Sequence, residues 1–224
     1  MARATSDPRP RPVAAPRIAP DLAPSTLDDG ITHDDRQSGV ALSGSLPAGT
    51  FARGVEIEDA RAEQVDLAGA RMPGIGLVDV ELRAANLANA DLRAASLRRV
   101  AIVRGRLTGI QWSGAKLDDV RFEGCQIDLA AFTGCELRRV TFDDCRLVGS
   151  DFQDLNAQDL VLTDCDLSDL DLTGARFART EMRRCTLDGI RSLDRLRGVG
   201  MGWDDVLASA GAFAGAIGIR LIDG

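Results

Sequence analysis

Several residue types that enzymes and membrane proteins depend on are scarce in this chain of 224 residues. It has no tyrosine and one histidine, and 4% of its residues are aromatic. No hydrophobic run approaches the 18 residues that a membrane-spanning helix needs, and the N-terminus has no apolar signal core. We therefore expect a cytoplasmic protein that does not enter a membrane.

The same scarcity argues against catalysis. His33 stands without partners at ligand spacing, and no glycine-rich phosphate loop is present. The aspartates fall at positions expected to face solvent, where nothing would push the pKa of one carboxylate away from that of another. We expect no enzymatic activity, no cofactor and no metal site.

What the sequence does contain is a five-residue repeat from Val55 to Gly189. From Leu67 every fifth residue is large and apolar through Leu187, with Ala157 as the exception, and in most repeats a smaller residue stands two places before it. A period of five matches neither the helix period of 3.6 nor the strand period of 2. Such a chain must turn a corner at each repeat, which predicts a solenoid.

Three stretches carry a family resemblance: Ala85-Asn86-Leu87, Ala90-Asp91-Leu92 and Cys165-Asp166-Leu167 fit the motif A(D/N)LXX. In this motif the chain resembles the pentapeptide-repeat family. The resemblance implies an all-β solenoid, a right-handed quadrilateral β-helix with four pentapeptides per coil. Composition and the limits of the repeat divide the chain into a disordered Pro/Arg-rich tail (1–39), the repeat domain (40–190) and a C-terminal helical cap (191–224).

Residues twenty apart test the four-sided coil. The charge alternates along one such series: Asp79, Arg99, Asp119, Arg139, Asp159 and Arg179. If coils stack about 4.8 Å apart, these side chains form a ladder of opposite charges. Each exposed ion pair contributes at most about 1 kcal/mol, so we interpret the ladder as a device that fixes register.

Apolar residues follow the same spacing. Phe122 would lie on Phe142, and Phe132 on Phe152 with Trp112 below them, so that the indole N–H needs a partner. Four of the five cysteines are also twenty apart: Cys125, Cys145, Cys165 and Cys185. A straight column does not give zinc its tetrahedral geometry, although its spacing would allow disulfides. We interpret these cysteines as small buried core residues.

After Gly189 the register ends, and a helix is predicted from Trp203, followed by a short apolar end. This segment would cover the open edge of the last coil, which would otherwise be free to pair with other strands. It resembles the tail of quinolone-resistance members of the family, so capping alone and capping with homodimerisation both stay open. The residues assigned to the cap or dimer are Trp203, Val206, Leu207, Phe213, Ile217, Ile219 and Leu221.

Some pentapeptide-repeat proteins resemble DNA in shape and charge and bind DNA gyrase. Residues 141–172 contain nine aspartates and one arginine, an acidic density comparable with the one charge per roughly 1.7 Å of duplex DNA. Residues 93–121 are net positive, which counts against mimicry. The candidate partner-binding residues are Asp143, Asp144, Asp151, Asp154, Asp164, Asp166, Asp169 and Asp171.

Two functions therefore remain. In the first, the chain is a DNA mimic that binds gyrase or another topoisomerase and protects it against quinolones or other gyrase poisons. In the second, it is a protein-binding scaffold with an unrelated partner. With a net charge of −7, direct binding of nucleic acid is not expected.

Overall fold

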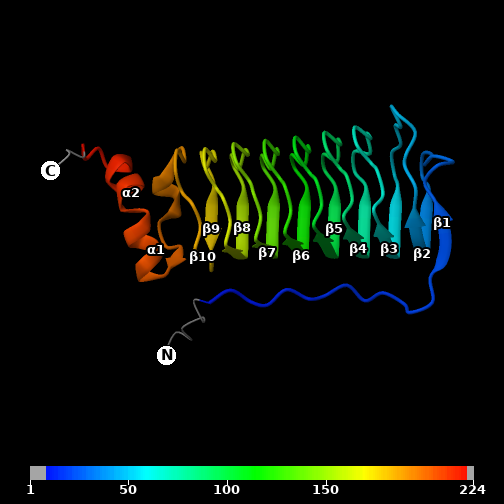
Figure 1. The fold of residues 1–224 in the computed structure, drawn as a ribbon, viewed down its shortest axis with the longest axis horizontal. Helices are drawn as coiled ribbons and strands as arrows, with labels where there is room; N and C mark the ends of the chain where they lie inside the picture. Colours follow the sequence, from blue (N-terminus) through cyan, green and yellow to red (C-terminus); the bar gives the residue numbers. More distant parts are fainter. Residues whose placement is uncertain (1–8, 221–224) are drawn as a thin grey trace, which may run out of the picture.

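The computed structural model describes residues 9–220, which form a rod of stacked parallel coils with two short helices at one end (Figure 1). Strands β1 to β8, then β10 and β11, follow one another along the rod, and β9 also pairs with β8. The strands are β1 (Ala23–Thr26), β2 (Arg36–Ser43), β3 (Glu56–Glu63), β4 (Gly76–Arg83), β5 (Ser96–Val103), β6 (Lys116–Glu123), β7 (Glu136–Asp143), β8 (Asn156–Thr163), β9 (Arg176–Ala178), β10 (Glu181–Arg183) and β11 (Gly200–Met201).

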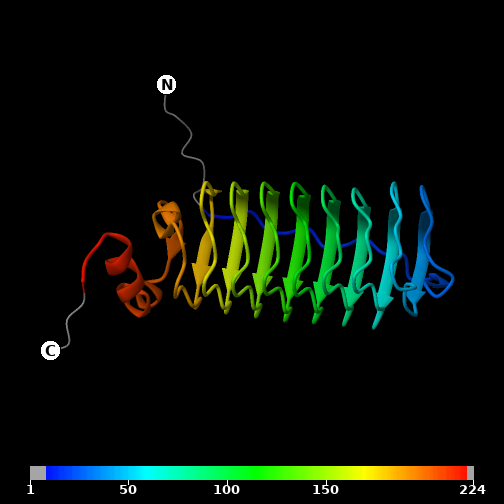
Figure 2. The ribbon, with the colours of Figure 1, turned by 90° about the horizontal axis from the view of Figure 1, so that it is seen from above.

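The register of the strands confirms the predicted solenoid. Neighbouring strands from β2 to β8 pair residues twenty apart, as in Leu97↔Leu117, and isolated bridges such as Asn86↔Arg106 keep the same offset elsewhere on the coil. Figure 2 shows the resulting row of parallel strands. We number the four sides by the coil of residues 115–134: side 1 is 115–119, side 2 is 120–124, side 3 is 125–129 and side 4 is 130–134.

Each side ends at a corner residue in the left-handed backbone region, which glycine adopts freely and Asp or Asn tolerate. Gly174 is such a corner, with φ +75°, and Asp154 occupies the same corner one coil earlier with φ +53°. A Cβ on Gly174 would lie 2.2 Å from the Asp154 Oδ1 atom. Glycine is therefore favoured at this corner by the backbone angle and required at Gly174 by the space that Asp154 occupies.

The core consists of the predicted columns of apolar side chains. The Phe122 and Phe142 rings are parallel with centroids 4.6 Å apart, and Phe132 and Phe152 meet at 4.9 Å in an edge-to-face arrangement. Trp112 packs 5.2 Å from Phe132 and is 1% exposed, and its Nε1 atom has no hydrogen-bond partner among the described residues. The aromatic columns are confirmed, and the indole N–H is buried at a cost.

The first coil contains a slip of one residue. Ser45 bridges to Asp66, twenty-one places on, before Phe51 returns to the offset of twenty by bridging to Arg71. The backbone N–H of Leu46 donates to the Asp66 carbonyl at 2.8 Å. Because of this slip Leu46 fills the large core position of side 3, although the period of twenty points to Pro47 there.

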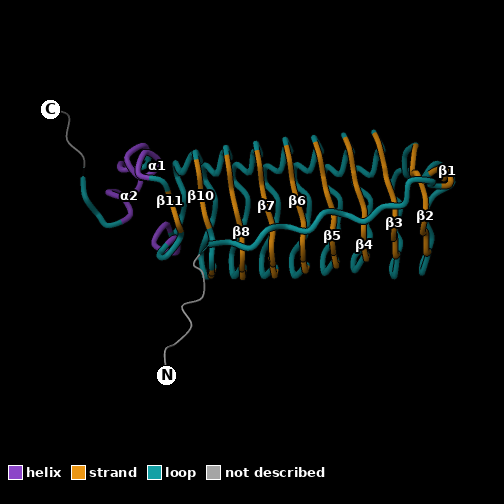
Figure 3. Tube along the Cα trace, turned by 90° about the horizontal axis from the view of Figure 1, so that it is seen from below, coloured by secondary structure: helices purple, strands orange, loops and turns teal. Residues whose placement is uncertain are grey.

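The N-terminal stretch differs from the disordered tail expected for residues 1–39. Residues 9–22 run extended along the outside of the rod, as Figure 3 shows, and residues 23–39 contain β1 and most of the first half of β2. Leu27 and Ile31 are buried in the core, where they close the first coil. The solenoid therefore begins near Ala23 instead of residue 40. Residues 1–8 of the expected tail lie outside the described residues.

The last coil is closed by the 3-10 helix η1 (Leu193–Leu196), whose Leu193 and Leu196 belong to the buried core. Beyond it lie α1 (Trp203–Ala208) and α2 (Ala210–Ala216), at the end of the rod. The predicted helical start at Trp203 is confirmed, but the interruption falls at Ser209 and Gly211 lies inside α2. Within residues 9–220 no helix has the length and apolarity to cross a bilayer.

Candidate functional site

The eight candidate aspartates, which we call the acidic zone, occupy consecutive coils at the C-terminal half of the rod. Their positions in the coil place them on three sides. Asp143, Asp144 and Asp164 are on side 2, Asp166 and Asp169 on side 3, and Asp151, Asp154 and Asp171 on side 4. The fold thus brings the zone together along the axis, but it does not gather these residues on one face.

Two members of the acidic zone are neutralised by arginines one coil further on. Asp164 accepts two hydrogen bonds from Arg184, at 2.5 and 2.7 Å, and these bonds hold the pKa of Asp164 below its usual range. Asp171 is buried and lies 3.2 Å from Arg191. Burial acts to raise the pKa of Asp171, but hydrogen bonds from Thr173 and the charge of Arg191 outweigh it and lower the pKa.

The clearest accumulation of like charge is on side 2. Asp143 and Asp144 are both exposed there. Loss of solvation, followed by the charges of Asp164 and Glu123, raises the pKa of Asp143 above its usual range. A carboxylate that feels two neighbouring carboxylates is favourable for a cationic partner, because binding relieves the repulsion.

Local hydrogen bonds hold two of the remaining aspartates and leave their charge in place. Asp151 accepts from the Thr133 hydroxyl at 2.8 Å, and Asp166 accepts from Ser168. The Asp154 and Asp169 carboxylates lie over the corner glycines of the next coil. The bonds of Asp151 and Asp166 fix the direction of these two carboxylates, so they present negative charge from defined positions.

Four of the seven basic residues in the net-positive stretch of residues 93–121 are paired with carboxylates. Arg93 bonds Asp91, Arg99 bonds Asp79, Lys116 lies 3.9 Å from Glu136, and Arg121 lies 3.5 Å from Glu123. Much of its positive charge is therefore compensated locally, which weakens the argument against mimicry that the sequence raised.

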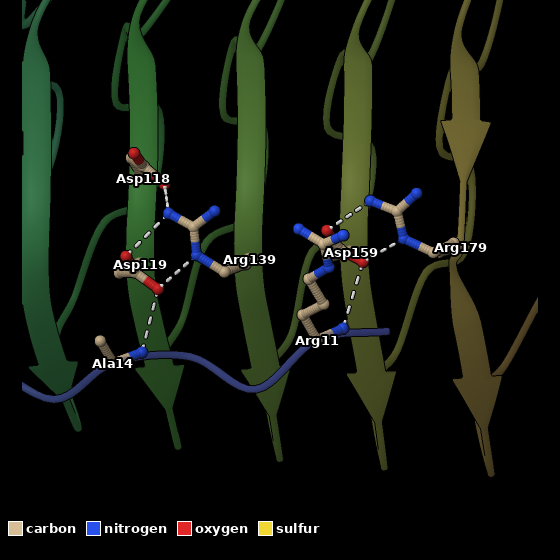
Figure 4. Close-up of polar contacts among 7 residues, drawn as sticks. All are labelled: Arg11, Ala14, Asp118, Asp119, Arg139, Asp159 and Arg179. Atoms are coloured by element: carbon tan, nitrogen blue, oxygen red, sulfur yellow. Dashed lines mark hydrogen bonds and ion pairs between the residues drawn. The ribbon is translucent and has the colours of Figure 1, made fainter. Parts of the chain in front are cut away.

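The predicted charge ladder of side 1 exists, as a series of separate pairs. Arg139 Nε and Nη2 bind the two Asp119 oxygens at 2.7 and 2.8 Å, and Arg179 binds Asp159 in the same way at 2.6 and 2.7 Å (Figure 4). Arg139 also contacts Asp118. These hydrogen bonds are the main cause of the lowered pKa values of Asp119 and Asp159.

The ladder aspartates have a second set of partners that the sequence did not predict. Main-chain N–H groups of residues 9–20, which we call the strap, donate to them, as Figure 4 shows for Arg11 and Ala14. His33 also has a contact that its isolation in the sequence did not suggest. Its Nδ1 accepts the Arg53 N–H at 3.1 Å, and its ring meets Phe51 edge-on.

The cysteine column is buried and its thiols are free. The Cys125, Cys165 and Cys185 sulfurs lie within 3.3–3.6 Å of main-chain carbonyls of the previous coil. Burial raises the pKa of Cys135, on side 1, to about 12. This environment fits the core-residue interpretation, and within residues 9–220 no cluster of three or more potential metal ligands occurs.

Sequence comparison decides the family. The "Pentapeptide repeat region" family matches residues 115–191, and "Pentapeptide repeats (8 copies)" matches 63–99 and 76–110, so that together they span more than half of the chain. The chain is a pentapeptide-repeat protein. No curated protein sequence matches it.

The solved structures that match this pentapeptide-repeat protein do so at low sequence identity and with TM-scores below 0.5. HetL, a pentapeptide repeat protein involved in heterocyst differentiation regulation from the cyanobacterium Nostoc sp. strain PCC 7120, is 20% identical with a TM-score of 0.47, covering 75% of this chain and 90% of its own. Trypsin-treated QnrB1, a plasmid-mediated fluoroquinolone resistance protein, is 11% identical with a TM-score of 0.46, covering 90% and 100%.

The C-terminal cap of this pentapeptide-repeat protein presents an apolar surface. Trp203, Leu207, Ile217 and Ile219 are more than half exposed. A groove at the cap is lined by Leu193 of η1 together with Val206, Leu207, Phe213, Ile217 and Ile219. The cap and dimer assignment stays a prediction, and Leu221 lies outside the described residues.

Proposed function

We propose that this pentapeptide-repeat protein is a non-catalytic binding protein whose acidic zone docks onto the DNA-binding surface of a protein partner. The specific candidate is DNA gyrase, which the bound protein would protect from quinolones or other poisons. The observation that carries the proposal is the negative charge that remains on the acidic zone when the aspartates paired with arginines are left out.

Between residues 141 and 172 stand nine aspartates. Three of them, Asp159, Asp164 and Asp171, pair with arginines of the next coil, and Arg146 pairs with Asp128 outside the zone. About six negative charges remain over roughly 8 Å of axis, if the coils stack about 4.8 Å apart. That is still close to one charge per roughly 1.7 Å, the density of duplex DNA.

A protein surface that binds the phosphate backbone of DNA can also bind a rigid rod with this charge density. The rod and DNA both hold their negative charges at regular intervals along a main chain, and both attract arginine and lysine over several ångströms. Binding of this kind weakens steeply with added salt. Charge-based binding needs no pocket and no reactive group, and the acidic zone supplies the carboxylates on which it depends.

The test is inhibition of gyrase supercoiling, and rescue of supercoiling from a quinolone, by the purified protein. The decisive variant is Asp143→Arg with Asp144→Arg. Arginine already occupies these two columns at Arg183 and Arg184, so the fold accepts it. The matched control is Glu58→Arg with Glu63→Arg, the same charge change on exposed residues at the other end of the rod.

We expect activity at micromolar protein, at least a tenfold loss in the acidic-zone variant, and no comparable loss in the control. Gyrase mimicry is rejected if the wild-type protein has no effect at 10 times that concentration, or if the two variants behave alike.

A protein-binding scaffold with an unrelated partner is the second candidate, and the apolar cap favours it. Exposed Trp203, Leu207 and Ile217 at the end of the rod form a surface that charge mimicry does not require. Homodimerisation is one use of this surface. Sedimentation equilibrium of the wild type and of Trp203→Asp with Ile217→Asp tests it: a dimer that the variant abolishes supports this use, whereas a wild-type monomer at 100 times the assay concentration contradicts it.

A further inference from the structure

The strap is held to the rod by its main chain. Four N–H groups donate to Oδ1 atoms of the side 1 ladder: Arg11 to Asp159 at 3.1 Å, Ala14 to Asp119 at 3.0 Å, Arg17 to Asp79 at 2.9 Å and Ala19 to Asp59 at 2.7 Å. The strap thus runs from the first coil back toward the C-terminal half, parallel to the axis of the rod (Figures 1 and 3).

The spacing of the first three of these bonds matches two periodicities, whereas the fourth, from Ala19 to Asp59, lies two residues and one coil further on. A polyproline II helix has three residues per turn and rises about 3.1 Å per residue, or roughly 9.3 Å per turn. Two coils of the rod advance about 9.6 Å. Donors at Arg11, Ala14 and Arg17 are three residues apart, and acceptors at Asp159, Asp119 and Asp79 are two coils apart.

The alternation of the ladder supplies this two-coil period. Arg99 and Arg139 stand on the rungs between the acceptors, and each binds the carboxylate of the coil before it. The arginine fixes the carboxylate, and the other lobe of the same Oδ1 receives the strap N–H (Figure 4). Acceptors are thus oriented before any peptide arrives, which lowers the cost of binding.

The prolines of the strap agree with this arrangement. Pro10, Pro12 and Pro16 have no N–H, and none of them falls on a donor position. They favour the extended backbone, which reduces the entropy lost on docking. The side chains of Arg11, Ala14 and Arg17 are exposed, and the hydrogen bonds to the rod come from the backbone. The charges of Arg11 and Arg17 add to this recognition, because they help to lower the pKa values of Asp159 and Asp79.

We propose that the row of ladder aspartates is a binding track for polyproline II peptides that carry a free N–H at every third residue. The strap is its resident ligand, and the occupant in trans is the strap of a second copy of this chain. Because its main-chain hydrogen bonds lie on the outside of the rod and no strap residue belongs to the buried core, the strap can leave the track while the coils stay folded.

The test uses full-length chain in which the strap is released. Ala14→Pro with Arg17→Pro removes two donors while keeping the polyproline II backbone. The matched control is Val13→Pro with Ala15→Pro, at positions outside the four bonds. The probe is a fluorescein-labelled peptide with the sequence of residues 9–21, and a second probe carries N-methyl groups on Ala14 and Arg17, which removes the donors without changing charge.

Hydrogen exchange checks release first: the amides of Arg11 and Ala19 should lose protection in the release variant and keep it in the control. Fluorescence anisotropy then measures probe binding. We expect the release variant to bind the probe at least about tenfold tighter than wild type or control, because the tethered strap competes at millimolar effective concentration. The N-methylated probe should show at least a tenfold loss.

The proposal is overturned by any of three results. In the first, Arg11 and Ala19 stay protected in the release variant. In the second, the release variant binds the probe no better than wild type. In the third, the N-methylated probe binds as well as the unmodified one. A rod variant, Asp79→Asn with Asp119→Asn, adds an independent check. If its circular dichroism signal is lost, the rod has unfolded; if the signal is kept, only the track has been lost.

Discussion

The N–H of Arg17 and the Nε of Arg99 bind the same oxygen, Oδ1 of Asp79, at 2.9 and 2.6 Å. One donor comes from the extended N-terminal stretch and the other from the neighbouring coil. The charge ladder that the sequence predicts as a register device therefore also anchors a segment 62 residues away.

This double use predicts how the strap responds to acid. Hydrogen bonds from Arg99, Arg139 and Arg179 are the main cause of the lowered pKa values of Asp79, Asp119 and Asp159. A lowered folded pKa contributes stability that is present above the unfolded value, about 3.9, and is lost as pH falls through the folded value. We expect strap amides to keep their protection from pH 7 to pH 4 and to lose it below that.

Hydrogen-exchange protection factors measure this for Ala14 and Arg17. The Ala94 N–H, which donates to the Ser113 carbonyl and not to a carboxylate, is the internal control. Strap amides that lose protection near pH 6, or that outlast Ala94 at pH 2, would contradict the assignment of the carboxylates as acceptors.

Two corner glycines separate backbone strain from crowding. At Gly114, with φ +70°, nothing lies within 4 Å of an added Cβ, whereas at Gly174 the Asp154 Oδ1 atom lies 2.2 Å away. Gly114→Ala should lower the free energy of unfolding by about 1 kcal/mol through its backbone angle alone. Gly174→Ala adds displacement of Asp154, and we expect about 2–3 kcal/mol. Chemical denaturation of both variants measures the difference, and equal losses would show that the crowding is relieved at no cost.

The aromatic columns predict that two core substitutions differ in how much they lower the free energy of unfolding. Phe132→Ala removes a fully buried ring that contacts Trp112 and Phe152, and should cost about 3–5 kcal/mol. Trp112→Phe also removes volume, but it removes the indole N–H that has no partner in the described part of the chain. Since an unsatisfied buried donor costs about 1–3 kcal/mol, we expect the net change to stay within roughly 1 kcal/mol. Urea unfolding of both variants tests this, and a loss for Trp112→Phe as large as that for Phe132→Ala would show that the N–H is satisfied.

The cysteines predict a thiol count that depends on folding. Cys125, Cys135, Cys145 and Cys165 are buried, and Cys185 is half-buried near the end of the column. Ellman's reagent should titrate at most one thiol in the native protein at pH 8 and five after denaturation in guanidinium. A Cys185→Ser variant should remove the native reaction. Fewer than five thiols in denaturant without reductant would indicate disulfides, and native reaction of several thiols would contradict the burial of the column.

Particular residues show how much of the structure could be predicted from the sequence. The five-residue period predicted the coil, the Phe columns and the pairs Arg139–Asp119 and Arg179–Asp159, because side chains that repeat in register must stack. The same rule relates Arg184 to Asp164 and Arg191 to Asp171. Those pairs lower the acidic density estimated from residues 141–172, because their arginines lie beyond the end of that stretch.

The docking of the strap on the rod could not be predicted by the same reasoning, and the cause is physical. A segment rich in proline and arginine has too little apolar surface to order itself, and its recognition here depends on main-chain N–H groups, which every non-proline residue has. The three-residue spacing of Arg11, Ala14 and Arg17 acquires meaning only when the two-coil spacing of the aspartates is known. Closure of the last coil by Leu193 and Leu196 also followed from packing, not from a repeat.

The route of the strap has a mechanical consequence. Because it runs from the first coil back to Asp159, the N-terminal end of the strap and the cap helices lie toward the same end of the molecule. Tension between residue 9 and the C-terminal helices would load the Arg11–Asp159 bond first and then open the others in turn, from Ala14 to Ala19. Pulling on the protein would thus peel off a thin external thread at low force long before any coil is sheared from its neighbour.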